Sequence, residues 1–251
     1  MVGDAYDESD GVFSIEDQDF DGDGTPDCLD SCPDDPNKID PGICGCRVPD
    51  TDSDVDGVAD CNDGCPKDPN KTAPGVCGCG IADTDSDDDG ELDCKDSDDD
   101  NDELNDDEEQ GPGGDDKDYD GNDDGIADFL QDNVASFHTY DDQSYVTMES
   151  PVGTSISNCK AVDNPYTTNS PSSIEFSYGF FEFKITGVGN GDVTTVILHF
   201  PVGATFDTYY KYGPTPSNDI DHWYEFLNDG QTGAEINGNV ITLHFVDGKK
   251  R

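Results

Sequence analysis

The sequence predicts a mainly β protein in two unlike parts: an irregular, disulfide-laced repeat rod followed by an antiparallel β-sandwich. Charge separates the two parts, because the first 133 residues carry 46 acidic and 6 basic side chains, whereas the last 118 carry 14 and 6. Of the 23 aromatic residues, 18 lie in the second part. Only the second part therefore has the apolar side chains that an ordinary hydrophobic core requires.

The overall composition excludes several classes of function. The chain of 251 residues has a formal net charge of -48, so it would repel phosphate, and nucleic-acid binding is excluded because it needs a basic surface. No apolar run approaches the ~20 residues that a transmembrane helix needs. Ten cysteines, mostly at regular spacings, predict a secreted protein, extracellular or on the cell surface. The first residues do not resemble a secretion signal, so we expect a mature or trimmed form.

An internal repeat with an offset of 33 residues organises the acidic part. Two copies share aspartates, a glycine and cysteines in register, and a third copy departs from the pattern where Asp98 replaces a cysteine. A disordered acidic tail would have no need of such a register. The matched acidic positions are Asp19, Asp21, Asp23, Asp27 and Asp30 in the first copy, Asp52, Asp54, Asp56, Asp60 and Asp63 in the second, and Asp85, Asp87, Asp89, Asp93 and Asp96 in the third.

This spacing predicts calcium-binding loops. Alternating aspartates place carboxylates on one side of a curling loop, and the glycine after the third aspartate permits a sharp reversal of the chain. Ca²⁺ binds six to eight such oxygens at roughly 2.3–2.6 Å. The aspartates three and six residues past the glycine are expected to close the coordination shell or to bridge to a second ion.

Two further loops are closer to an EF-hand loop. In the first, Glu103 occupies the position where glycine is usual, so we expect a distorted turn. Five loops predict at least about five calcium ions, and paired ions would raise the number to roughly ten. The ions would be structural, and without them like charges would leave the region disordered. The expected ligands are Asp98, Asp100, Asp102, Asp106 and Glu109, with the backbone of Leu104, in the first loop, and Asp120, Asn122, Asp124, Asp128 and Gln131 or Asp132 in the second.

The cysteines allow two disulfide schemes. A sequential scheme, which we favour, pairs neighbours and leaves Cys28 and Cys159 over, whereas a nested scheme leaves Cys94 and Cys159 over. Zinc is a poor alternative, because the spacings do not suit a zinc knuckle and no histidine lies nearby. The sequential pairs are Cys32–Cys44, Cys46–Cys61, Cys65–Cys77 and Cys79–Cys94, and the nested scheme places Cys28–Cys46 around Cys32–Cys44.

The second part has the composition of β-strands. Val, Ile, Thr, Tyr and Phe alternate with polar residues between glycine and proline breaks, and no helical stretch is present. Two similar segments, 196–200 and 241–245, place Leu198 and Leu243 on one face and His199 and His244 on the other. Short strands at this spacing favour a sandwich. The expected strands are 144–149, 155–161, 176–186, 193–200, 207–212, 222–227 and 239–246.

The acidic loops and their cysteines resemble bacterial thrombospondin type 3 repeats over roughly residues 17–132. That resemblance implies a calcium-filled rod with almost no regular secondary structure. From about Gly121 onward the chain resembles the choice-of-anchor U domain, through the segments 120–128, 131–136, 180–185 and 246–248. This second resemblance implies export and surface presentation, usually with a sorting signal after the domain. The expected domains are an arm at 1–16, the repeats at 17–132 and the sandwich at 133–251.

No catalytic constellation is evident, so we expect a protein that is not an enzyme. No metalloprotease, nucleophile-elbow or phosphate-loop motif occurs. His138 is expected in a loop, and paired carboxylates are too frequent here to indicate a glycosidase. Aromatic residues at 209–212 and 222–224 could stack on sugar rings, although core packing or an assembly interface explains them better.

These observations predict a secreted, calcium-stabilised structural protein that assembles head-to-tail into a filament, a cell-surface fibre or a matrix. The partner would be a second copy, whose apolar arm segment Val12–Ile15 adds as a strand to an open sandwich edge. Cys28 and Cys159 could then link subunits covalently. The alternative is a monomeric cell-surface adhesin, in which a calcium-stiffened stalk carries a sandwich that binds a glycan or a surface protein.

Overall fold

The computed structural model describes residues 18–164, 166, 170–171 and 174–248. The chain divides into two compact units, Met1–Ala82 and Asp83–Arg251. The expected boundary between residues 132 and 133 lies inside the second unit, so the third repeat and both EF-hand-like loops share a unit with the β-strands. The predicted arm at 1–16, with its segment Val12–Ile15, lies outside the described residues.

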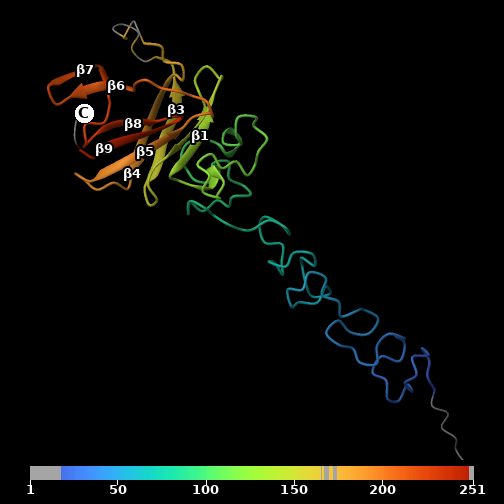
Figure 1. The fold of residues 1–251 in the computed structure, drawn as a ribbon. Coiled ribbons are helices and arrows are strands. Elements are labelled where there is room, and N and C mark those ends of the chain that lie inside the picture. The colour runs from blue at the N-terminus through green and yellow to red at the C-terminus, as the bar shows by residue number, and fades with distance from the viewer. Residues whose placement is uncertain (1–17, 165, 167–169, 172–173, 249–251) are drawn as a thin grey trace, which may run out of the picture. The chain divides into compact units, whose positions relative to one another are not determined.

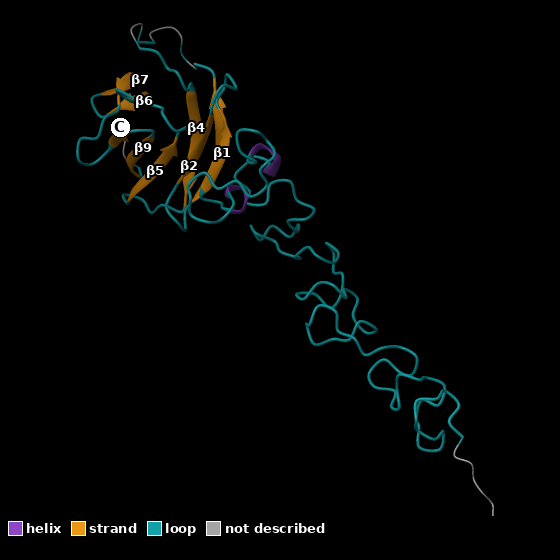
Figure 2. Cartoon of the chain, turned by 45° about the vertical axis from the view of Figure 1, so that its right-hand side comes forward, coloured by secondary structure: helices purple, strands orange, loops and turns teal. Residues whose placement is uncertain are grey.

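The described residues of the first unit, 18–82, contain neither helix nor strand (Figure 2). Polar bonds to the backbone hold the turns. Lys38 Nζ donates to the carbonyl oxygens of Pro41 and Gly45 at 2.9 and 2.8 Å. Lys71, 33 residues later, uses its Nζ in the same way on two carbonyl oxygens. The unit is therefore stabilised by local polar contacts and covalent bonds, since its sequence supplies too few apolar side chains for a core.

Disulfides in this region alternate between bonds within a repeat and bonds to the next repeat. Both predicted schemes are wrong, because Cys44 bonds forward along the chain whereas Cys46 bonds backward. Gly45 between them has a φ of 83°, which reverses the chain and separates the two thiols. The eight bonded cysteines cannot ligate zinc. The bonds are Cys32–Cys46, Cys44–Cys61 and Cys65–Cys79, and the remaining bonded cysteines, Cys77 and Cys94, make the fourth.

Cys28 and Cys159 carry free thiols, as the sequential scheme predicted. Cys28 is exposed, whereas Cys159 is only 3% exposed and belongs to the hydrophobic core. A covalent link between subunits through Cys159 is therefore wrong, because its sulfur cannot be reached in the folded unit.

The second unit is mainly β, and its sheets are antiparallel (Figure 1). The largest sheet has five strands in the order β1-β2-β5-β9-β8. Two hairpins, β3–β4 and β6–β7, form separate two-stranded sheets. The strands are β1 (Val134–His138), β2 (Tyr145–Glu149), β3 (Ser155–Val162), β4 (Phe180–Thr186), β5 (Val193–His199), β6 (Tyr210–Thr215), β7 (Asn218–Glu225), β8 (Gly233–Asn237) and β9 (Val240–Val246).

One hydrophobic core joins the five-stranded sheet to the hairpins. It contains Met148, Leu198 and Leu243 from the sheet and Ile156 from β3, all at most 1% exposed. Side chains of β4, together with Tyr209 and Tyr224, pack against this cluster. Burying such side chains contributes roughly 1.5–3 kcal/mol each, so this unit has the stabilisation that the first unit lacks.

Four of the seven predicted strands match observed ones closely, and the predicted strands at 207–212 and 222–227 correspond to the shifted hairpin β6–β7. The predicted strand at 176–186 begins later, at Phe180. Strands β1 and β8 were not predicted. Strand β1 is buried on both faces from Val134 to Phe137, so it shows no alternation of polar and apolar residues. His138 lies at the end of β1 and not in a loop.

Acidic loops cover one face of β1 and β2 within this unit. Tyr145 of β2 donates its hydroxyl proton to the carbonyl oxygen of Glu108 at 2.9 Å, and the Gly111 N–H donates to the Tyr145 hydroxyl at 3.2 Å. Two 3-10 turns, η1 (Asp106–Glu108) and η2 (Asp128–Leu130), lie in these loops. The EF-hand-like loops are therefore packed against the sheet, and their stability is tied to it.

Candidate metal centres

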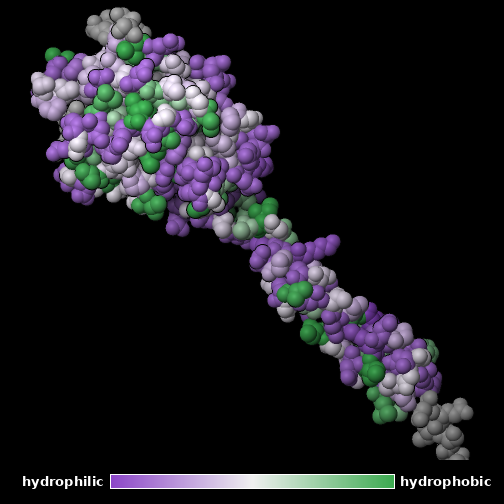
Figure 3. All heavy atoms as spheres, viewed as in Figure 1, coloured by the Kyte–Doolittle hydropathy of each residue, from purple (hydrophilic) through white to green (hydrophobic). Residues whose placement is uncertain are grey.

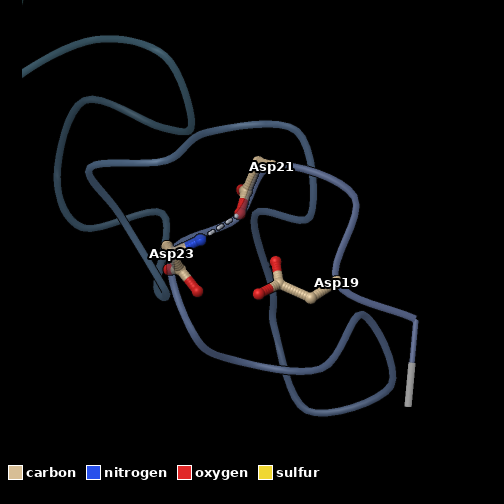
Figure 4. Close-up of side chains that lie close together, drawn as sticks. All are labelled: Asp19, Asp21 and Asp23. Carbon is tan, nitrogen blue, oxygen red and sulfur yellow. Dashed lines mark hydrogen bonds between the residues drawn. The ribbon is translucent and has the colours of Figure 1, made fainter. Parts of the chain in front are cut away.

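Four groups of aspartates gather among the described residues. In each group three side chains offer one carboxylate oxygen apiece, and these oxygens all lie within 4.8 Å of one another. Figure 4 shows the first group, whose carboxylates face a common space inside one turn of the chain. The first three groups were predicted from the repeat and the fourth from the EF-hand-like loop that follows it. The groups are Asp19, Asp21 and Asp23; Asp52, Asp54 and Asp56; Asp85, Asp87 and Asp89; and Asp98, Asp100 and Asp102.

All five predicted loops share an unusual backbone. The fourth residue of each loop has a φ between 57° and 82°, and the sixth has a φ between 77° and 100°. Glu103 adopts the second of these conformations at φ 77°, so the expected distortion of its turn is wrong. The loop keeps its shape although a side chain other than glycine is strained there. The residues concerned are Gly22, Val55, Asp88, Asn101 and Asp123 at the fourth position and Gly24, Gly57, Gly90, Glu103 and Gly125 at the sixth.

Backbone N–H groups donate to the loop carboxylates and hold the backbone, and the first aspartate of a loop uses both of its oxygens, as Asp52 and Asp120 do. Asp52 Oδ2 accepts the Gly57 N–H at 3.0 Å, and Asp120 Oδ2 accepts the Gly125 N–H at 2.8 Å. At the fifth position Asp102 Oδ1 accepts the Leu104 N–H at 2.7 Å. These bonds fix the loop. At the third and fifth positions they leave the second carboxylate oxygen of Asp54, Asp56, Asp100 and Asp102 without a hydrogen-bond partner.

Ten carboxylate oxygens in the described part of the chain are buried without a hydrogen-bond partner. Burying an unpaired carboxylate is strongly unfavourable unless a cation compensates the charge. The unpaired oxygens concentrate in the same loops, so the donor set is hard, anionic and preformed, which suits Ca²⁺. They belong to Asp21, Asp30, Asp54, Asp56, Asp63, Asp85, Asp98, Asp99, Asp100 and Asp102.

Five predicted ligands have a different local role. In every loop the eighth residue after the first aspartate is another aspartate whose carboxylate accepts the N–H of the second residue, as Asp60 Oδ1 does from Ser53 at 2.8 Å. Asp106 Oδ1 accepts the Asp99 N–H at 2.9 Å in the same way. These side chains close the loop and lie outside the four groups. The set is Asp27, Asp60, Asp93, Asp106 and Asp128.

The aspartates six residues past the loop glycine, Asp30, Asp63 and Asp96, differ in their hydrogen bonds. Asp30 and Asp63 are 8% and 9% exposed, and in each one oxygen accepts a cysteine N–H while the other is unpaired. Their charges also raise the pKa of Asp21 and Asp54, after the larger effect of burial. Both therefore remain suitable ligands. Asp96 instead accepts the N–H groups of Ser97 and Asp98.

The loop at 98–109 is the most deeply buried of the five. Burial, followed by the charge of nearby aspartates, raises the pKa of Asp100 to about 9 and of Glu109 to about 11. Burial also raises the pKa of Asp102 to about 7. Glu109 is 1% exposed, and its Oε1 accepts the Ser136 N–H of β1 at 2.8 Å. A cation here would replace protons on several carboxyl groups and connect directly to the sheet.

The last loop, at 120–132, has Asn122 where the other four loops have an aspartate, so it offers fewer carboxylates than each of the four groups. Asp128 is fully buried, and its Oδ2 bonds the Ser136 hydroxyl, while burial raises its pKa to about 6. Asn122 Oδ1 accepts the Asp124 N–H at 3.2 Å. Asp132 Oδ2 accepts the Ser155 hydroxyl proton at 2.7 Å. The backbone of this loop has the same conformation as the other four loops. Two of its aspartates, Asp128 and Asp132, use carboxylate oxygens in hydrogen bonds to serine hydroxyls.

Three buried aspartates were missed by the sequence analysis. Asp35 and Asp68, 5% and 8% exposed, each accept two N–H groups, and the Arg47 N–H lowers the pKa of Asp35. They occupy equivalent positions at the 33-residue offset, which was the available signal. Asp99, 4% exposed with an unpaired oxygen, has no such regularity to reveal it.

The conformation of Glu103 leads to a stability prediction. Glu103→Gly is expected to raise the free energy of unfolding of the calcium-loaded second unit by about 1 kcal/mol relative to Glu103→Ala, because only glycine relieves a positive φ. Both variants remove the same charge, so alanine is the matched control. Urea denaturation in calcium measures the difference, and equal stability of the two variants would contradict it.

The four histidines offer no catalytic arrangement with the groups around them. His199 and His244 lie on the face of their strands opposite Leu198 and Leu243, as predicted, and each contacts a glutamate, at 3.2 and 3.4 Å. The candidate sugar-stacking residues pack mainly against other rings. Tyr212 stacks on Tyr166 with ring centroids 3.7 Å apart. In the described residues no helix is long and apolar enough to cross a membrane.

Comparison with known proteins adds no relative. No family model, no curated protein and no solved structure matches this chain.

Proposed function

We propose that this protein is a secreted structural protein whose acidic loops are held together by calcium. The observation that carries the proposal is the set of ten buried, unpaired carboxylate oxygens, which recur in loops of one backbone conformation. A catalytic metal site would be a poorer interpretation, because catalysis needs one open site, whereas here similar sites repeat along the chain. The proposed ligands are the four aspartate groups, supplemented by Asp30, Asp63 and Glu109.

The remaining features fit an extracellular location. Four disulfides persist in oxidising surroundings, and the weak calcium sites of extracellular modules fill at millimolar calcium. We further propose that the repeats are thrombospondin type 3-like and that the β-rich unit is a sandwich of the choice-of-anchor U kind. The packing of two hairpins against one five-stranded sheet supports the sandwich.

Head-to-tail assembly into a filament or matrix is the proposed role. Electron microscopy of the purified protein in about 2 mM calcium, and again after EGTA, tests it. Fibres that soften or dissolve in EGTA are the expected result. Single particles in calcium at all concentrations would contradict assembly and favour the adhesin, whereas fibres indifferent to EGTA would contradict calcium as the stabilising agent.

A further inference from the structure

The layer formed by the two hairpins is open between β4 and β6. Strand β4 pairs only with β3, and β6 pairs only with β7, among the strands that the structure describes. A groove of about 1110 Å³ lies between them. Both hairpins therefore present an unpaired backbone edge to one groove, which is the arrangement that accepts an added strand.

The groove has a mixed lining in which aromatic and aliphatic side chains lie among polar ones. Phe183 and Ile185 of β4 line one side, Tyr209 and Lys211 line the other, and Phe245 of β9 lies at its base. In Figure 3 hydrophobic side chains reach the surface of this unit in small groups that are mixed with hydrophilic ones.

Lys211 lies against the aromatic side chains of the groove. Its Nζ lies 5.2 Å from the ring centroids of both Phe226 and Phe245. Burial lowers the pKa of this lysine.

We propose that residues Val12–Ile15 of a second copy add as a strand between β4 and β6. The proposal rests on the proposed head-to-tail assembly and names its contact. Every strand that the structure describes is already placed in a sheet. Of the segments outside the described residues, only 1–17 is long enough for a strand, since the others hold three residues or fewer. That segment contains Val12-Phe13-Ser14-Ile15, in which the apolar residues Phe13 and Ile15 stand at alternate positions, as on one face of a strand.

The alternation of a strand gives the arm two unlike faces. Phe13 and Ile15 share one face and Val12 and Ser14 share the other. The face with Phe13 would pack on the aromatic base of the groove, while Ser14 would point to solvent. The backbone of the arm would pair with both open edges, so the added strand would join two hairpins into one continuous sheet.

Two arm variants of the full chain separate this contact from assembly in general. Phe13→Asp places a charge on the aromatic base and is expected to abolish fibres in calcium. Ser14→Asp adds the same charge to the solvent face and is expected to leave fibres intact. Fibres that persist in Phe13→Asp would overturn the arm contact while the proposed assembly stands, and an absence of fibres in the unchanged protein would overturn the assembly itself.

A binding measurement tests the groove directly in the Phe13→Asp chain. Trp223 is the single tryptophan of the protein and lines the groove, so its fluorescence reports occupancy. A synthetic peptide of residues 8–17 is expected to change this fluorescence in a saturable way, and the same peptide carrying Phe13→Asp should bind at least about tenfold more weakly. Equal responses to both peptides would overturn the proposal. A response to chitohexaose or cellohexaose and none to the peptide would overturn it in favour of a glycan site.

Sedimentation of the unchanged protein shows whether the arm that fills the groove comes from a second copy or from the same chain. Particles whose mass grows with protein concentration, and which the peptide disperses, are the expected result. A monomer at all concentrations whose Trp223 fluorescence equals that of the peptide-bound state would mean that the arm fills the groove of its own chain. That result would overturn the contact between two copies.

Discussion

Removing calcium with EGTA from the protein in about 2 mM calcium is expected to lower the free energy of unfolding of the second unit by about 2–5 kcal/mol. Each ion with a dissociation constant of 10⁻³ to 10⁻⁴ M contributes about 0.7–1.8 kcal/mol at this concentration. Three of the predicted loops, starting at Asp85, Asp98 and Asp120, belong to this unit. The loss corresponds to a fall in melting temperature of roughly 4–20 °C.

Differential scanning calorimetry with and without EGTA measures this loss, and one pair of variants assigns it to the buried loop. Asp102→Asn removes a charge from a fully buried aspartate with an unpaired oxygen, and should abolish much of the calcium dependence. Asp107→Asn removes the same charge from an exposed residue of the same loop, and should leave the dependence unchanged. Equal behaviour of the two variants would contradict the assignment of Asp102 as a ligand.

The second large effect is a reversal of the pH dependence of stability when calcium is removed. Burial raises the pKa of Asp99 and Asp102 from an ordinary value of 3.8 to about 7, and that of Asp100 to about 9. A carboxyl group whose pKa is raised in the folded state holds a proton that it would lose on unfolding. Without calcium, the stability of the second unit is therefore greatest below about pH 4 and falls as pH rises toward 9.

A single carboxyl group displaced from 3.8 to about 7 corresponds to on the order of 4 kcal/mol across this range. With calcium the sign reverses, because the ion takes only deprotonated carboxylates and is displaced by protons on acidification. Thermal melts between pH 4 and 9, in EGTA and in calcium, should give slopes of opposite sign. Parallel slopes would show that these carboxyl groups do not bind the ion.

The sequence was sufficient to predict the acidic loops that gather carboxylates but not the role of every side chain in them. Spacing alone located all four aspartate groups, because ligands that come from one short loop leave a local pattern in the chain. It could not distinguish Asp21, with an unpaired oxygen, from Asp27, which closes its loop by accepting the Phe20 N–H. Both are aspartates at regular offsets, and only the direction of the side chain separates them.

Contacts between distant residues were predicted less well. The disulfide pattern depends on how Gly45 directs Cys44 and Cys46, which spacing does not reveal. Strand β1 was missed since the loops at 98–130 cover its second face, and that cover is itself acidic. Glu109 was predicted as a ligand from its place in the loop, but its bond to Ser136, which crosses 27 positions, has no local signature in the sequence.

The overlapping disulfides have a mechanical consequence. A pulling force along the first unit would follow the shortest covalent path, from Cys32 through sulfur to Cys46, back two residues to Cys44, and through sulfur again to Cys61. Four residues further on, Cys65 passes the force directly to Cys79. The residues between these points lie outside the shortest covalent path and carry no tension, so their loops would keep their shape under load. This stretch would behave as a nearly inextensible tether that lengthens only when a reductant cuts it.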